Sequence, residues 1–455
     1  MIYLVLIFGL VLRLVSLNQS FWLDEATTLN VASQFSFIEI ITKFSPGDFH
    51  PPLYYLLLKL WTSVFGMNEI SARMFSVLAG LASIYFVYLI GKKLVGKKVG
   101  LVSALLLATS GLHIYYSQEA RMYGLACLFV LLAIYSFMLI QKMGKKLSWL
   151  IFSLSLPLIF LTDYVSFLLV PVFWLMAINK PKSWLKKFVL SQIPLVLSFL
   201  IWTPTLTRQL TAGIGVKTAL PGWWSLLGGI SPKEIALVPV KFAIGRISFD
   251  NQFVYGAMAL LPILLFSYLA FRSIRKSKIV WLWLFVPLIL AAIVSLFIPV
   301  FYYFRLLFVL PAMYLLVALG LNSIKSKFGY VLLILVLLIN LTTSGIYLFT
   351  PRFHREDWRG LLKFVEREGF NKSYAVVFPA GSQQEAYRYY GGKVVDKEMI
   401  DKNYDQVWLV RYVQEIFDPS DSAREKIEGL GYNKTLELNF NGVVVWRYEN
   451  YENRN

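Results

Sequence analysis

The sequence predicts a polytopic α-helical membrane protein with a small C-terminal α/β domain. Of its 455 residues 57% are apolar and 15% are charged, whereas soluble domains carry roughly 25% charged residues. The charge is also unevenly divided, because the first 350 residues hold 28 basic and 9 acidic side chains while residues 351–455 hold 16 and 17. This composition excludes a soluble enzyme and a disordered protein. A disulfide scaffold is excluded as well, since Cys127 is the single cysteine.

Long apolar runs in residues 1–350 predict about eleven membrane-spanning helices, because a helix needs roughly 20 apolar residues to cross the hydrocarbon core. The first run has no small-residue cleavage site, so we expect a retained span and not a removed signal peptide. The runs lie at residues 1–17, 70–91, 98–112, 123–141, 147–161, 164–179, 188–206, 253–271, 279–300, 303–322 and 329–350.

The loops between these runs alternate in charge. Five of them carry 17 basic residues and no acid, namely 92–98, 142–146, 180–187, 272–278 and 325–327. All nine acids of the first 350 residues lie in or beside the other loops. By the positive-inside rule the N-terminus is then cytoplasmic, and the C-terminal domain lies outside the cell membrane. Basic residues placed between apolar runs indicate membrane orientation and no nucleic-acid partner.

The apolar segment 53–66 is not counted as a crossing. Counting it would move the basic loop at 92–98 to the external face, against the other four basic loops. We therefore expect an interfacial or re-entrant helix within a long external loop, residues 18–69.

Residues 351–455 predict a soluble α/β domain of a size that can fold around its own core. Segments 355–368 and 420–430 have helical patterns, and 375–380 and 406–413 have strand patterns. Asn441-Gly442 separates two apolar alternating runs, which indicates a hairpin because this dipeptide readily adopts a type I′ turn.

The first external loop contains two candidate catalytic carboxylates and a histidine. Asp24 and Glu25 follow the first span directly, and a carboxylate placed there can accept a proton from a hydroxyl; the simpler alternative is a solvated loop acid. In His50-Pro51-Pro52-Leu53-Tyr54-Tyr55 the prolines fix a helix start and direct His50 to the membrane surface. The alternative is a helix start with an incidental histidine.

The second external loop gathers Gln118, Glu119, Arg121 and Tyr123. Ionisable groups at a membrane boundary are costly and tend to face protein or a water-filled cavity. A helical segment would place Glu119 and Tyr123 on one face, and a Glu119–Arg121 pair that only anchors a helix start is the alternative.

Other external groups add positive charge. Arginines on this side offer paired donors to the oxygens of a lipid-borne phosphate, although one such arginine alone is more often a headgroup anchor. The groups are Arg73, Asp163, Arg246, Arg305 and the segment 351–358, which includes Arg352 and Arg355. No Gly-rich phosphate loop, HExxH or Cys/His metal spacing occurs.

Four of these patterns together resemble the GT-C superfamily of membrane glycosyltransferases, in particular the protein O-mannosyltransferases and the lipid A aminoarabinose transferases. They are Asp24-Glu25, the His-Pro-Pro-Leu-Tyr-Tyr element from His50, Gln-Glu-Ala-Arg-Met-Tyr from Gln118, and Arg-Glu-Asp-Trp-Arg from Arg355. The resemblance implies an inverting transfer of a sugar from a polyprenyl-phosphate donor to an acceptor hydroxyl of a protein, lipid or glycan on the external face.

The resemblance also implies roles for individual residues. Asp24 would be the general base, and Glu25 would hold the site or contact the acceptor. The donor and its phosphate would be bound by His50, Gln118, Glu119, Arg121, Tyr123, Arg305 and Arg352, with support from Arg73, Tyr54, Tyr55 and Asp163. No cofactor is required by these motifs, and a divalent metal stays an open alternative.

Two other classes of protein compete with this interpretation. A transporter or flippase usually places ionisable groups near the bilayer midplane, often in repeated halves; here the acids lie at one edge and the sequence has no evident repeat. A non-catalytic scaffold predicts that Asp24, Glu119 and Arg121 can be changed to alanine together without loss of function.

Overall fold

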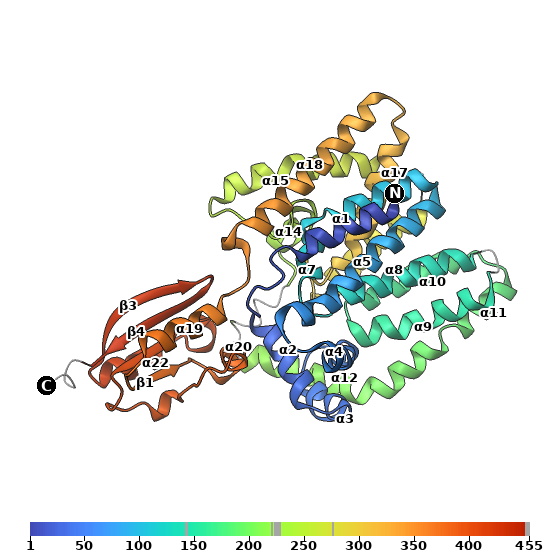
Figure 1. Cartoon of the computed structure of the whole chain (residues 1–455). Helices are drawn as coiled ribbons and strands as arrows, with labels where there is room; N and C mark the ends of the chain where they lie inside the picture. The colour runs from blue at the N-terminus through green and yellow to red at the C-terminus, as the bar shows by residue number, and fades with distance from the viewer. Residues whose placement is uncertain (142–143, 220–221, 223–228, 275–276, 451–455) are drawn as a thin grey trace.

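The computed structural model describes residues 1–141, 144–219, 222, 229–274 and 277–450, so that Lys142, Arg275 and Lys276 of the basic loops lie outside the described residues. The chain up to Phe349 is helical (Figure 1). Its longer helices are α1 (Ile2–Leu14), α2 (Leu23–Gln34), α4 (Leu53–Phe65), α5 (Glu69–Leu94), α6 (Lys97–Ala108), α7 (Gly111–Ser117), α8 (Tyr123–Ile140), α9 (Lys146–Thr162), α10 (Val170–Ala177), α11 (Lys182–Leu190), α12 (Ile193–Ala219), α14 (Pro232–Ile244), α15 (Gln252–Phe271), α16 (Lys278–Val294), α17 (Leu310–Ser323) and α18 (Lys327–Phe349). Short turns lie at α3 (Phe37–Glu39), Ile40–Phe44, Ser45–Gly47, Ser166–Leu169 and Leu307–Val309.

The predicted polytopic helical fold is confirmed, and a helix lies on each of the eleven predicted runs. Five helices of the described part are long and apolar enough to cross a membrane alone: α5, α8, α11 with α12, α15 and α18. The bent pair α6 and α7 would make a sixth, and the other apolar helices are shorter. Eleven crossings therefore stay a prediction.

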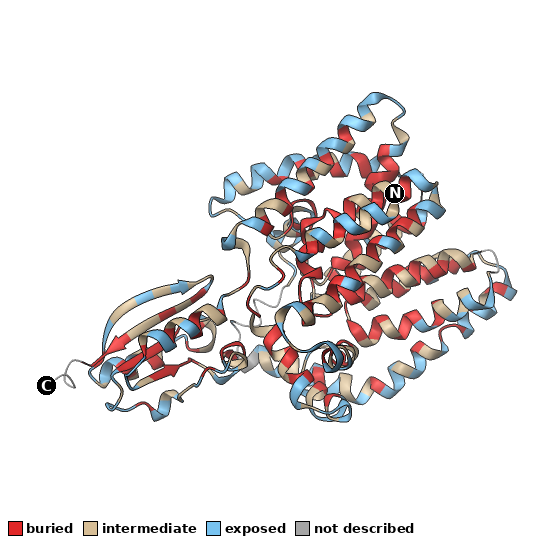
Figure 2. Cartoon of the chain, in the orientation of Figure 1, coloured by how far each residue is buried: buried red, intermediate tan, exposed pale blue. Residues whose placement is uncertain are grey.

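Apolar side chains divide between an inner core and an outer surface. Ile84, Leu106, Leu131 and Leu315 on α5, α6, α8 and α17 are fully buried. The outer helices α12, α15 and α18 carry large exposed apolar side chains (Figure 2). Continuous exposed apolar surface of this kind suits contact with lipid and not with water.

The break between α6 and α7 bends the chain by 65°. Backbone groups freed inside a membrane need partners, and side chains of two other helices supply them. Asn340 donates to the carbonyl of Leu106 at 3.1 Å, Arg13 to that of Ala108 at 3.1 Å, and Ser344 to that of Thr109 at 2.7 Å. The bent pair leads directly into the loop 118–122.

The C-terminal part forms the expected small α/β domain, with a sheet in the order β1-β2-β4-β3. β1 and β2 are parallel, and the other pairs are antiparallel. Its elements are α19 (Trp358–Glu368), β1 (Tyr374–Val377), α20 (Glu385–Tyr389), β2 (Gln406–Val410), α21 (Gln414–Phe417), α22 (Ser422–Gly429), β3 (Asn433–Phe440) and β4 (Val443–Glu449), with short turns at Pro351–Phe353, Gly381–Gln383 and Lys397–Met399. Asn441 and Gly442 both have positive φ, as the predicted type I′ turn requires.

The predicted helix 355–368 begins later, at Trp358. The carboxylate of Asp357 accepts a hydrogen bond from the backbone N–H of Gly360 at 2.9 Å. Asp357 thus caps the helix, and residues 354–357 stay extended and pass close to α2.

The C-terminal domain is docked beside α2 and the start of α5 (Figure 1). The hydroxyl of Tyr390 accepts from the N–H of Phe21 at 2.7 Å and donates to Glu69 at 2.8 Å, and Arg359 pairs with Glu69 at 3.0 Å. Asn30 donates to Glu385 of α20 at 2.6 Å. These contacts fix the domain against residues 18–69.

Candidate functional site

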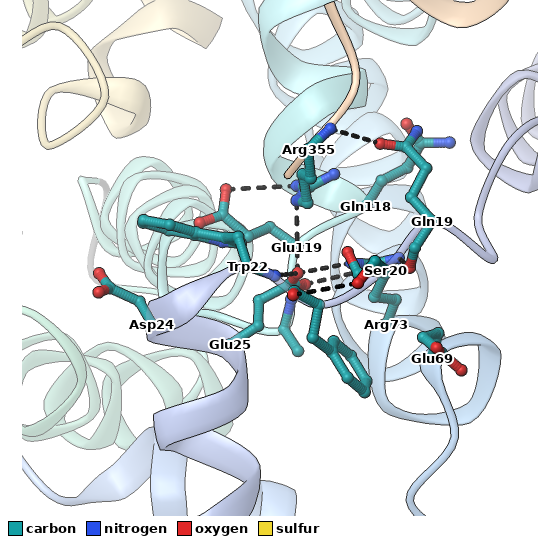
Figure 3. Close-up of polar contacts among 12 residues, drawn as sticks. Gln19, Ser20, Trp22, Asp24, Glu25, Glu69, Arg73, Gln118, Glu119 and Arg355 are labelled. Carbon is teal, nitrogen blue, oxygen red and sulfur yellow. Dashed lines mark hydrogen bonds and ion pairs between the residues drawn. The ribbon is translucent and has the colours of Figure 1, made fainter. Parts of the chain in front are cut away.

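The two adjacent carboxylates at the start of α2 have different surroundings. Successive residues of a helix point about 100° apart, so Asp24 and Glu25 cannot share an environment. The Asp24 side chain is 38% exposed, whereas that of Glu25 is fully buried. Figure 3 shows the two carboxylates turned away from each other.

Glu25 is surrounded by hydrogen-bond donors. Arg73 of α5 contacts its two oxygens at 2.9 and 2.5 Å, and the N–H of Ala120 donates at 2.7 Å. Arg355 approaches at 3.4 Å. Burial alone would raise the pKa of Glu25, but Arg73 and Arg355 hold it below its usual value. Of the two roles implied for Glu25, this geometry supports holding the site.

Arg73 extends this structural centre into the loop before α2. Its guanidinium also donates to the carbonyls of Leu17, Gln19 and Ser20. One buried arginine thus fixes the path of the chain between α1 and α2, which agrees with the supporting role expected for it.

Asp24 faces Arg121, whose guanidinium lies 3.5 Å from its carboxylate. The same guanidinium contacts the hydroxyl of Thr28 at 3.2 Å and the Nε2 of His50 at 3.4 Å. The loop 18–69 and the loop 118–122 therefore meet at Asp24. Because Asp24 is the partner of Arg121 and the segment 118–122 forms a turn, the Glu119–Arg121 pair and the shared helical face with Tyr123 are not found.

His50 is oriented by a second carboxylate. Its Nδ1 lies 3.4 Å from Asp48, which also accepts a hydrogen bond from the hydroxyl of Tyr55 at 2.7 Å. Burial would raise the pKa of Asp48, but His50 and Tyr55 outweigh it and lower that pKa to about 2. Tyr55 thus supports His50 through Asp48.

Glu119 is buried close to Arg355 (Figure 3). One carboxylate oxygen accepts from Arg355 at 3.5 Å, and the other, Oε1, has no hydrogen-bond partner among the described residues. Burial raises the pKa of Glu119 to about 7, although Arg355 opposes the shift. Glu119 is therefore a carboxyl group poised between its two protonation states near neutral pH.

Three buried or half-buried cations form no ion pair within the described part of the chain. Arg246 faces Glu119, Arg305 faces Asp163 and Asp24, and Lys241 lies beside Arg246. Arg246 donates to the hydroxyl of Tyr303 and lies 4.7 Å from the ring centroid of Tyr115. Lys241 donates to the carbonyl of Ile247 at 2.9 Å, and its burial, together with Arg246, lowers its pKa to about 7. Arg305 donates to the carbonyl of Pro299 at 2.5 Å. Unneutralised positive charge in a desolvated position favours an anionic ligand.

The polar groups of several predicted site residues are engaged by other parts of the protein. Gln118 donates to the carbonyls of Arg13 and Val15 and accepts from Tyr347. Tyr54 contacts the hydroxyl of Ser76 at 3.1 Å. Asp163 accepts from the N–H and hydroxyl of Ser166 and so begins the turn Ser166–Leu169. The ring of Tyr123 packs 5.2 Å from that of Phe304, next to Arg305.

Arg352 does not lie with the predicted donor-binding residues. It is exposed and pairs with Asp250 at the surface, at 2.5 Å. Arg355, three residues later, points inward. The turn Pro351–Phe353 and the extended segment after it separate the two side chains, and the sequence motif alone did not indicate which arginine would turn inward.

Arg246, Lys241 and Asp48 could not be recognised from the sequence as individual site residues. Arg246 was only one of several arginines expected on the external side, and no local pattern separates it from the others. Lys241 lies on α14, a helix that no apolar run indicated. Among the described residues no group of three His, Cys, Asp or Glu side chains could hold a metal ion.

Comparison with known proteins agrees with this architecture. Residues 49–207 match the family model described as dolichyl-phosphate-mannose-protein mannosyltransferase. The fold is similar to that of ArnT from Cupriavidus metallidurans, with a TM-score of 0.57 and 10% identity in the apo state, covering 98% of this chain and 97% of that chain. For ArnT bound to undecaprenyl phosphate the TM-score is 0.55 at 11% identity, with the same coverage.

Two further relatives extend the comparison. The archaeal oligosaccharyltransferase AglB from Archaeoglobus fulgidus, solved with an inhibitory peptide and a dolichol-phosphate, gives a TM-score of 0.52 at 12% identity and covers 98% of this chain and 74% of that chain. An uncharacterized protein of Aquifex aeolicus (strain VF5) is 24% identical over 329 residues, which are 68% of this chain and 60% of that protein. The match thus spans less than two thirds of the Aquifex protein. The chain therefore has a fold similar to those of ArnT and AglB, and residues 49–207 match a mannosyltransferase family model.

Proposed function

We propose that this protein transfers a sugar from a polyprenyl-phosphate donor to an acceptor hydroxyl on the external face of the cell membrane. The observation that carries the proposal is the position of Asp24. It is a half-exposed carboxylate beside Arg121, near cations that form no ion pair among the described residues, and the similar fold of ArnT was solved bound to undecaprenyl phosphate.

Asp24 is suited to the role of general base. Glu25 and Asp163 each accept several hydrogen bonds from the protein, and Asp48 accepts one from Tyr55 and lies beside His50, whereas Asp24 keeps an exposed face that an acceptor hydroxyl can reach. In the reaction the acceptor oxygen forms a bond to the anomeric carbon and its proton passes to Asp24. The bond between the anomeric carbon and the phosphate oxygen breaks at the same time, which inverts the anomeric centre.

The leaving group is then the polyprenyl phosphate, on which negative charge develops. Cations placed where that charge appears stabilise the transition state most. Arg246 and Arg305 are the best candidates, because neither forms an ion pair among the described residues. Lys241, whose pKa is lowered to about 7, lies next to Arg246, and Arg121 and His50 lie beside Asp24. A guanidinium also offers paired donors to phosphate oxygens.

The same proposal includes the orientation of the chain. The five basic loops would be cytoplasmic, while α2, the loop 118–122 and the C-terminal domain would lie outside. The acceptor would approach the exposed side of Asp24 from the aqueous side.

A transfer assay with the purified protein tests this function. With polyprenyl-phosphate sugars as donors, Asp24→Asn should lower kcat on the order of 100-fold or more, because it removes the proton acceptor. Asp250→Asn is the matched control, since Asp250 is 87% exposed and lies outside the cluster; it should retain most of the activity. A folded Asp24→Asn protein that transfers sugar at the wild-type rate would contradict the assignment.

A further inference from the structure

Arg355 is an arginine of the C-terminal part that is buried inside the membrane part's site. It lies in the extended segment before α19, yet its side chain is 1% exposed. Figure 3 shows it between Glu119 and Glu25, at 3.5 Å from the first and 3.4 Å from the second. Two carboxylates from different elements thus share one guanidinium.

The position of Arg355 is set by contacts on both sides. Its N–H donates to the side chain of Gln19 at 3.0 Å. Its carbonyl accepts from the side chain of Asn441, at 2.8 Å, in the hairpin turn between β3 and β4. Its guanidinium lies 4.5 Å from the ring centroid of Tyr115 and donates to the carbonyl of that residue at 3.4 Å. The C-terminal sheet and the first loop therefore both hold this one residue.

Arg355 makes the two carboxylate oxygens of Glu119 unequal. Arg355 holds Oε2 of Glu119, which leaves Oε1 as a buried acceptor without a partner in the described residues. The charged groups that face Glu119 are Arg355, Glu25, Arg121 and Arg246. A buried carboxylate oxygen without a partner among the described residues, on a residue that faces Arg355 and Arg121, can accept a hydrogen bond from a hydroxyl or amino group of a bound sugar.

We propose that Arg355 is a positioning residue, through which the docked C-terminal domain orients Glu119 for the donor sugar. On this view the domain is a fixed part of the site, and the contacts of Glu69 with Arg359 and Tyr390 serve to place Arg355. The inference rests on the proposed function, because it assigns a sugar to the free oxygen of Glu119.

The test uses the full-length purified protein and two readouts. The first is kcat/KM for sugar transfer. The second is the titration of Glu119, followed as the carboxyl band in infrared difference spectra, with Glu119→Gln to identify the band. We compare Arg355→Gln with Arg355→Lys, which keeps the charge but not the planar fork, and with Arg367→Gln, whose side chain is 72% exposed on α19.

Arg355→Gln should lower kcat/KM by about tenfold or more and move the Glu119 titration to higher pH, because its nearest cation is removed. Arg355→Lys should restore part of kcat/KM and part of the shift in the Glu119 titration. If Arg355→Gln does not fold, Arg355→Lys is compared with the wild-type protein by the same two readouts. Arg367→Gln should change neither. The proposal is overturned if Arg355→Gln leaves both readouts unchanged, or if it moves only one of them. If the wild-type protein transfers no sugar, the proposed function fails, while the infrared titration still decides whether Arg355 holds Glu119.

Discussion

At the scale of single residues, adjacency in the sequence did not mean a shared role. Asp24 and Glu25 were both expected at the catalytic site, with Asp24 as the base, but α2 leaves Asp24 partly exposed and buries Glu25 against Arg73, Ala120 and Arg355. The sequence could not show that Glu25 is buried, because these partners come from distant residues. Arg352 and Arg355 likewise lie close in sequence but in different surroundings, because the turn Pro351–Phe353 leaves Arg352 exposed and Arg355 buried.

Glu119 carries a prediction about pH. Its pKa is raised by burial to about 7, so between its ordinary value and about 7 the folded protein binds a proton that the unfolded chain has released. The free energy of unfolding should therefore fall as the pH rises from the ordinary glutamate pKa to about 7. Above about pH 7 the titration of Glu119 should cause no further fall.

Glu119→Gln should flatten that fall, since glutamine does not titrate. Thermal unfolding in detergent at a series of pH values measures the effect, with the exposed Glu366→Gln as the control. Equal slopes for the wild-type and Glu119→Gln proteins would show that Glu119 titrates at its ordinary value.

At the scale of elements, the long apolar runs and the Asn-Gly turn were predictable because their signals are local. An apolar helix and a type I′ turn depend on a few neighbouring residues. Helices α2 and α14 had no such signal, as both are short and partly polar. The bend between α6 and α7 was also invisible, because its stability depends on partners from α1 and α18.

The bend carries a second prediction. Asn340→Ala should lower the free energy of unfolding by about 1–3 kcal/mol, because it leaves the carbonyl of Leu106 without its side-chain donor inside the helical core. Asn322→Ala, on the exposed end of α17, is the matched control. Thermal unfolding in detergent compares the two variants, and equal midpoints would show that Asn340 does not support the bend.

At the scale of the whole molecule, charge along the sequence predicted an orientation but not the docking of the C-terminal domain. The positive-inside rule sums over many lysines and arginines, so it tolerates errors in single spans. Docking depends on a few long-range pairs, such as Glu69 with Arg359 and Glu25 with Arg355, and no periodicity in the sequence marks such pairs.

The orientation of the chain is the claim on which the lipid-linked donor, the base and the acceptor all depend. It can be measured in intact cells with a membrane-impermeant maleimide, after the buried Cys127 is replaced by serine. Cysteine is then introduced at Ser33, which is exposed near the C-terminal end of α2, the helix that begins with Asp24, or at Ser326, which is exposed before α18. The account predicts labelling of Ser33→Cys in intact cells and of Ser326→Cys only after permeabilisation; the opposite pattern would place Asp24 in the cytoplasm and contradict the proposed function.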